Sequence, residues 1–108
     1  MTLSHVKVEI FYGKARDKAG ERILIHAQRR AEKSIEGAAD KLLGGWTAYE
    51  TRGGWQGVRE PGGVIMTTIR AGDLHLTENI RLMADAIKAA LNQESVYIVT
   101  TPVMGLEY

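Results

Sequence analysis

The order in which strand-like and helix-like patterns follow one another restricts the fold of this chain more than any other feature of its sequence. Residues 5–13, 46–52, 57–70 and 95–101 have patterns typical of strands. Helix-like patterns separate the first of these stretches from the second, and the third from the fourth. The predicted order is therefore strand, helix, strand, strand, helix, strand.

The first predicted strand shows the alternation most clearly. Apolar side chains at every second position alternate with mostly charged ones, which is typical of a strand that buries one face. We expect this strand to end at Gly13. The two sets are Val6, Val8, Ile10 and Tyr12 on one side, and Lys7, Glu9 and Phe11 on the other.

The second and third predicted strands are expected to form a hairpin. The residues between them, Gly-Gly-Trp-Gln at 53–56, provide a flexible connection. Pro61–Gly63 interrupts the third strand, and we expect a bulge there. The fourth predicted strand, residues 95–101, ends before Pro102.

Each predicted helix carries an apolar stripe at helical spacing. The first helix lies within residues 21–45, with Gly44-Gly45 as its stop signal, and the second begins at Thr77 as its N-cap. The stripes are Ala27, Ala31, Ile35, Ala38, Ala39 and Leu42 in the first helix, and Ile80, Met83, Ala84, Ile87 and Leu91 in the second.

This order of elements predicts an α+β fold, a split βαβ or ferredoxin-like βαββαβ sandwich. In it, four antiparallel strands carry two helices on one face. A chain of 108 residues with 44% hydrophobic residues suits a single domain, residues 1–108, around one modest core. The helices leave the other face of the sheet uncovered, and its apolar side chains predict oligomerisation through the sheet.

Composition makes several classes of function improbable. The 14 Lys and Arg residues nearly balance the 13 Asp and Glu residues, so we expect no nucleic-acid partner. The chain has no Cys, which excludes disulfides, thiolate metal ligands and a Cys nucleophile. No signal-peptide pattern and no membrane-length apolar run occurs, so we expect a cytoplasmic protein without membrane contact.

Sequence motifs for metal or cofactor binding are also missing. His5, His26 and His75 have no acidic or Cys companions at metal-ligand spacing. Neither a P-loop nor a G-x-G-x-x-G motif occurs, and no serine has the surroundings of a nucleophile elbow. We therefore expect neither a metal site nor a cofactor.

The hairpin offers the most suggestive pair of side chains. A four-residue loop at 53–56 would place Tyr49 directly opposite Glu60, and a two-residue loop at Gly53-Gly54 would make them diagonal neighbours on one face. Either register pairs a phenol with a carboxylate. The alternative is that Glu60 is a solvated strand charge and Tyr49 a half-buried packing residue, and spacing does not decide between the two.

Three segments resemble a known family. The segments "YETRGGWQGVRE", "NQESVYIV" and "GLEY" are similar to the phage-encoded S-adenosylmethionine lyases, long labelled hydrolases. These enzymes are trimers whose fold is similar to that of the PII signalling proteins. The resemblance covers roughly residues 44–108. Its most telling residues are Glu50, Gly57, Arg59, Glu60, Gly105, Leu106 and Tyr108.

The resemblance implies a function and a site. It implies cleavage of S-adenosylmethionine to 5′-methylthioadenosine and L-homoserine lactone, without a cofactor, in a homotrimer whose sites lie between subunits. Carried over to this sequence, the residues at the reacting group would be Glu60 and Tyr49, and Glu50 and Arg59 would bind substrate. Two other functions remain open: a PII-like trimer that binds a nucleotide or small effector without converting it, and a purely structural oligomer.

Overall fold

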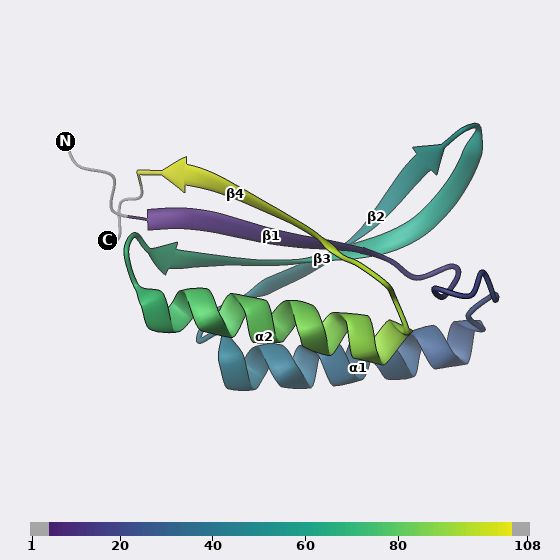
Figure 1. Ribbon diagram of the computed structural model, residues 1–108, viewed down its shortest axis with the longest axis horizontal. Helices are drawn as coiled ribbons and strands as arrows, with labels where there is room; N and C mark the ends of the chain where they lie inside the picture. The colour runs from purple at the N-terminus through teal and green to yellow at the C-terminus, as the bar shows by residue number, and fades with distance from the viewer. Residues whose placement is uncertain (1–4, 105–108) are drawn as a thin grey trace.

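The computed structural model describes residues 5–104, apart from the side chains of Trp55 and Leu74 (Figure 1). Gly105, Leu106 and Tyr108 of the C-terminal motif lie outside the described residues. The elements are β1 (His5–Gly13), α1 (Ile25–Leu42), β2 (Thr47–Trp55), β3 (Val58–Arg70), α2 (Leu74–Leu91) and β4 (Tyr97–Val103).

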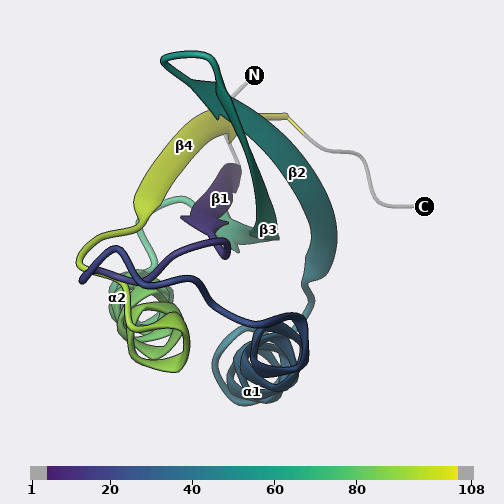
Figure 2. The same cartoon turned by 90° about the vertical axis from the view of Figure 1, so that its right-hand side faces the viewer.

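These elements form the predicted α+β ferredoxin-like sandwich. The four strands lie in the order β2-β3-β1-β4, and every neighbouring pair is antiparallel. Both helices cover the same face of the sheet (Figures 1 and 2). We call the opposite side of the sheet the open face. On β1 it carries Lys7, Glu9 and Phe11, and on the other strands it carries the residues that the register places beside these.

The core lies between the sheet and the two helices, as the hydrophobic patterns predict. On β1, Val8, Ile10 and Tyr12 are buried on the helix side. The apolar stripe of α2 is buried along its whole length, and Ala31, Ile35 and Ala39 are buried on α1. Burial of this apolar surface is the main stabilising contribution to the fold.

The first helix lies within the predicted range, and the second begins earlier than predicted. The helix α1 starts at Ile25, because the preceding residues form a loop in which the Asp17 carboxylate accepts hydrogen bonds from the N–H groups of Ala19 and Glu21. The helix α2 starts before Thr77, which was the predicted N-cap. Asp73 caps it instead, since its carboxylate accepts the Leu76 N–H at 3.1 Å.

The hairpin between β2 and β3 turns later than expected. Gln56 and Gly57 form the turn with φ values of 47° and 83°, both in the left-handed region, which suits a two-residue hairpin. The strands therefore continue through Gly53-Gly54, and the predicted loop at 53–56 is wrong. Figure 2 shows the hairpin extending beyond the rest of the sheet.

The bulge expected at Pro61–Gly63 is also wrong. The strand β3 keeps one continuous register with β2 and with β1 through this segment. The glycines instead allow β3 to lie close to Tyr12, since a Cβ at Gly63 would overlap the phenol ring of Tyr12. The strand β4 extends past Pro102, which is tolerated because β4 is at the edge of the sheet.

Candidate functional site

The four predicted site residues lie on two different sides of the hairpin. Alternation along the strands places Tyr49 and Glu60 on the open face, and Glu50 and Arg59 on the helix-facing side. All four are exposed. Of the four, Tyr49 and Glu50 line one common hollow.

The predicted pairing of Tyr49 with Glu60 does not form. Tyr49 lies opposite Val64, and Glu60 lies opposite Gly53, because the turn is at Gln56-Gly57. The positions of Glu60 and Val64 differ by four residues along β3, a separation of about 13 Å. Tyr49 and Glu60 share the open face without touching each other.

The actual partner of Tyr49 is Glu9 on β1. The Tyr49 hydroxyl donates a hydrogen bond of 2.6 Å to Oε2 of Glu9, so the phenol ring spans β3. This hydrogen bond, together with burial and the negative charge of Glu9, raises the pKa of Tyr49. On the same face, Val64 is fully buried between its register neighbours Tyr49 and Phe11.

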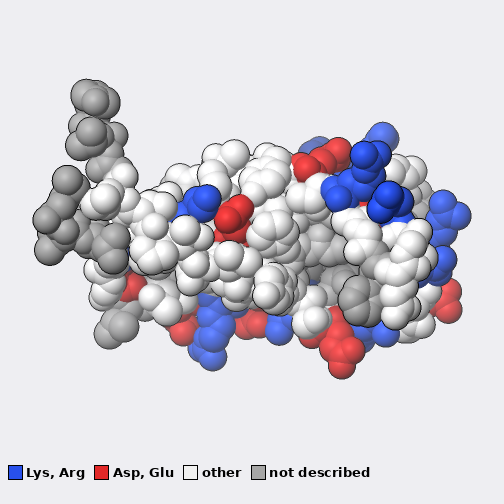
Figure 3. Space-filling view, turned by 90° about the horizontal axis from the view of Figure 1, so that it is seen from above, with Lys and Arg blue, Asp and Glu red and all other residues white. Residues whose placement is uncertain are grey.

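The open face is otherwise largely uncharged. Lys7 and Glu9, whose Nζ and Oε1 lie 3.8 Å apart, are the charged residues that the register places near its middle. Figure 3 views this side of the molecule and shows mostly uncharged surface between the two ends, with Lys and Arg gathered at the end that carries the hairpin. Tyr97 is 72% exposed here. Such a surface is typical of a face that a partner covers.

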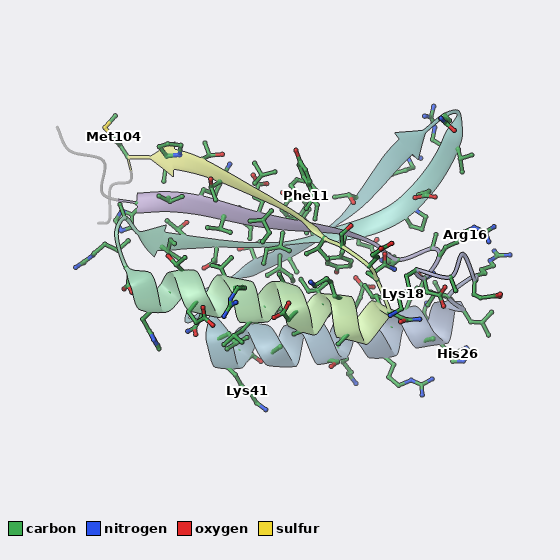
Figure 4. The ribbon with its side chains drawn as sticks, in the orientation of Figure 1. Phe11, Arg16, Lys18, His26, Lys41 and Met104 are labelled. Carbon is green, nitrogen blue, oxygen red and sulfur yellow. The ribbon has the colours of Figure 1, made fainter. Side chains whose placement is uncertain are left out.

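Side chains shown as sticks distinguish the two sides of the molecule. In Figure 4, Phe11 belongs to the strand side, and Lys41 extends from α1 away from the sheet. Exposed charged residues form a layer on α1, among them Arg29, Lys33 and Asp40, as on solvated helix surfaces generally. The open face lacks such a layer between its ends (Figure 3).

A charged cluster lies on the helix side of the sheet, at the end of β1. The buried Lys14 Nζ donates to Glu32 Oε1 at 3.0 Å and to Glu50 Oε1 at 3.1 Å. Tyr12 donates to the other oxygen of Glu32, Oε2, at 2.9 Å. Burial, the Glu32 hydrogen bond and the nearby carboxylates raise the pKa of Tyr12 well above its usual range.

Opposing effects act on the Lys14 ammonium. Burial is the largest single one and lowers its pKa, but the hydrogen bonds and charges of Glu32 and Glu50 together outweigh it, so that the pKa is raised. A buried cation with two carboxylate partners is stable in its charged form. Lys14 therefore ties β1 to both α1 and β2.

Two hollows adjoin this cluster and share Glu50. The smaller, of about 250 Å³, has three acidic residues in its wall; Tyr12, Glu32, Glu36, Ala48, Tyr49, Glu50 and Ile65 line it. The larger, of about 570 Å³, has Ile23, Leu24, Ile25 and Pro61 among its walls. Glu60 lines neither of them, although the next residue, Pro61, lines the larger.

Neither a metal-binding cluster nor a membrane-spanning helix occurs among the residues that the structure describes. Residues 5–104 contain no group of three or more His, Asp or Glu side chains arranged to hold a metal ion. Over the same residues, neither helix combines the length and apolar character that a bilayer span requires.

Sequence reasoning missed three residues of these clusters: Glu9, Lys14 and Glu32. In the sequence, Glu9 is only one of the charges that alternate along β1, and Lys14 lies just beyond the predicted end of that strand at Gly13. Glu32 directly follows Ala31 of the buried stripe of α1, and this position was the available signal that it faces the sheet.

The fold is similar to solved structures of known proteins, although no protein-family model and no curated protein matches the chain. A phage SAM lyase in complex with S-methyl-5′-thioadenosine is 15% identical, with a TM-score of 0.62 over 94% of this chain and 84% of that one. A phage SAM lyase in the apo state, also 15% identical, has a TM-score of 0.57 over 94% and 83%.

The plant protein CutA1 has a related structure. CutA1 from Oryza sativa is 15% identical, with a TM-score of 0.50 over 98% of this chain and 85% of CutA1. At these identities the similarity establishes the fold alone. This chain shares the α+β ferredoxin-like architecture with phage SAM lyase and CutA1.

Proposed function

We propose that this protein is an S-adenosylmethionine lyase that acts as a homotrimer with its sites at subunit boundaries. The products would be 5′-methylthioadenosine and L-homoserine lactone. The observation that carries the proposal is that Tyr49 and Glu60 both lie on the uncovered face, where a neighbouring subunit would enclose a substrate. The fold similarity to a SAM lyase that holds S-methyl-5′-thioadenosine supports it.

The chemistry demands little of the protein. S-adenosylmethionine carries its own nucleophile, the carboxylate, and its own leaving group, methylthioadenosine on a sulfonium. Holding the chain folded, with a carboxylate oxygen behind the carbon bound to sulfur, can contribute roughly 7–11 kcal/mol in favourable cases. Orientation is therefore the proposed mechanism, and it requires neither a metal nor a base.

Glu60 is the proposed anchor of the substrate ammonium. A carboxylate about 4 Å from a cation gains on the order of 4 kcal/mol at an effective dielectric near 20. Contact with the sulfonium would act against catalysis, because that charge disappears in the transition state and its stabilisation would favour the ground state. Anchoring the ammonium leaves the substrate carboxylate free to attack.

The other predicted residues take different places in this proposal. Because Tyr49 and Glu60 of one protomer lie about 13 Å apart along the open face, the pair that meets one substrate ammonium would come from neighbouring subunits. Glu50 lines one hollow with Tyr49, and Arg59 lies on the helix-facing side of the projecting hairpin; we assign both to contacts with substrate. Since S-adenosylmethionine is made and used in the cytoplasm, the protein would act there and deplete the methyl donor.

The decisive experiment is chromatography of S-adenosylmethionine after incubation with the purified protein in water enriched in heavy oxygen. Lactone formation followed by spontaneous opening places the label in the carboxylate of homoserine. Direct hydrolysis, with Glu60 as the base that activates water, would place it in the hydroxyl. We expect carboxylate label only, with lactone visible at early times at mildly acidic pH.

Two other results would reject the proposal. Saturable binding of S-adenosylmethionine without products would indicate a PII-like effector-binding protein. A protein that neither binds nor cleaves S-adenosylmethionine would be a structural oligomer. Hydroxyl label would retain the site but replace the intramolecular mechanism.

A further inference from the structure

The hydrogen bond between Tyr49 and Glu9 has a fixed direction. A carboxylate oxygen only accepts hydrogen bonds, so the single O–H of the phenol must be the donor in this 2.6 Å contact. A phenolic oxygen that has donated its proton retains only its ability to accept. Tyr49 therefore offers a ligand on the open face an acceptor and no donor.

Glu9 lies deeper in this surface than Tyr49. The side chain of Glu9 is 16% exposed, and its second oxygen, Oε1, is 3.8 Å from Lys7 Nζ. Tyr49 is 42% exposed. A ligand that approaches the open face therefore reaches the phenol more easily than the carboxylate, and Glu9 acts on it through Tyr49.

We propose that Glu9 is a positioning residue of the lyase site: it takes the proton of Tyr49 and so dedicates the phenol oxygen to the substrate ammonium. This inference rests on the proposed function and specifies which end of the substrate Tyr49 binds. An ammonium has three N–H donors and no acceptor, so it complements an oxygen that can only accept. The negative charge of Glu9 adds to the attraction.

The arrangement also protects the nucleophile. If Tyr49 donated its proton to the substrate carboxylate, the hydrogen bond would stabilise the charge that must attack carbon, and this stabilisation would be lost in the transition state. With the proton held by Glu9, the carboxylate oxygen stays free. It forms the C–O bond as the C–S bond breaks, the electron pair goes to sulfur, and no proton is transferred.

The test compares three ligands that are not lyase substrates, so binding can be measured without turnover. S-adenosylhomocysteine has the ammonium and the carboxylate, the 3-aminopropylthio analogue of adenosine has only the ammonium, and S-methyl-5′-thioadenosine has neither. Glu9→Gln removes the charge and leaves only a neutral, weaker acceptor for the phenol proton, so it should weaken the first two by about tenfold and change the third by less than about twofold.

The matched control is Glu78→Gln, which removes a carboxylate that is paired with Arg81 on α2, on the other side of the sheet. It should leave all three affinities unchanged. Equal weakening of all three ligands by Glu9→Gln would overturn the proposal, because it would mean general damage to the site. Weakening of S-adenosylhomocysteine alone would overturn it too, since Tyr49 would then bind the carboxylate.

A second measurement tests the pair without any ligand. Ultraviolet titration, with Tyr49→Phe subtracted to isolate the Tyr49 signal, should show a lower pKa for Tyr49 in Glu9→Gln than in the wild type. An unchanged pKa would overturn the pairing itself.

If the wild type binds the amine-bearing ligands but does not cleave S-adenosylmethionine, the lyase proposal fails and the assignment of the ammonium stands. If it binds none of the three, both fail.

Discussion

Lys14 and Glu50 form an ion pair of 3.1 Å between one buried and one exposed side chain, with exposed fractions of 8% and 84%. The buried ammonium has a second partner, Glu32, at 3.0 Å, whose side chain is 25% exposed. Glu50 can therefore leave Lys14 without stranding a buried charge. The Lys14–Glu32 contact therefore holds the cluster together, whereas Glu50 can bind another group without leaving the ammonium unpaired.

We expect Lys14→Met to lower the free energy of unfolding by about 2 kcal/mol, because it removes a charge-assisted hydrogen bond in a partly buried site. Glu50→Gln should cost less than about 1 kcal/mol, since its carboxylate is exposed. Urea unfolding of both variants measures the difference. Equal losses would mean that the exposed carboxylate contributes as much as the buried contact.

Stability should fall at alkaline pH. The pKa values of Tyr12 and Lys14 are both raised by folding, so the folded state holds protons that the unfolded state releases above about pH 10. The contribution of both groups is complete below that pH and is lost as pH rises toward their folded pKa values. Urea unfolding at a series of pH values from neutral to alkaline should show this decline, and Tyr12→Phe should reduce its slope. A flat profile would contradict the arrangement around Glu32.

Gly63→Ala should destabilise the protein by about 1–3 kcal/mol, because the added methyl group would overlap the buried ring of Tyr12 and force it to move. The matched control is Gly53→Ala on the neighbouring strand β2, where an added Cβ has no atom within 4 Å. Thermal unfolding of the two variants provides the comparison. Equal midpoints would show that the ring adjusts without cost.

Tyr97→Glu should dissociate the proposed trimer, because it puts a charge on the open face at a side chain that is 72% exposed in the protomer. Leu82→Glu is the control, since Leu82 is 42% exposed on α2, behind the sheet. Sedimentation velocity at micromolar concentration distinguishes monomer from trimer. A wild-type protein that sediments as a monomer would remove the basis for sites at subunit boundaries.

Glu60→Gln should lower kcat/KM for S-adenosylmethionine by at least about 100-fold, since it removes the charge that anchors the ammonium and hardly changes side-chain volume. Tyr49→Phe should have a smaller effect. The measurement is initial rates over a range of substrate concentrations, with circular dichroism to verify folding. A near wild-type rate with an unchanged Michaelis constant would make Glu60 a solvated strand charge.

The sequence was sufficient to predict the fold, because the information lies in short-range periodicity. The alternation of Val8, Ile10 and Tyr12 identifies the buried side of β1, and the stripe from Ile80 to Leu91 identifies that of α2. The hairpin turn was misplaced because Gly53-Gly54 and Gln56-Gly57 are both reasonable turn sequences. The later turn is favoured because β3 also pairs with β1, and that pairing places Gly62 and Gly63 beside Tyr12. The sequence of the hairpin alone does not reveal this pairing.

The polar clusters could not be predicted for the same reason. The partners of Lys14 are 18 and 36 residues away, and the partner of Tyr49 is 40 residues away. Their contacts depend on how three strands and a helix assemble, whereas sequence spacing describes only neighbours within one element or hairpin. Thus Tyr49 and Glu60 were correctly placed on one face, but the carboxylate that binds the phenol was missed.

The continuous register of β3 restricts how this hairpin can diverge. The strand β3 pairs with β1 on one side and with β2 on the other. A single residue inserted into β3 would therefore move the side chains beyond it to the opposite face of the sheet, relative to both neighbouring strands. Residues added in matched pairs at the Gln56-Gly57 tip, one on each strand, leave every other pairing intact. The reach of the hairpin can therefore lengthen or shorten among related chains by pairs, while the faces it presents stay the same.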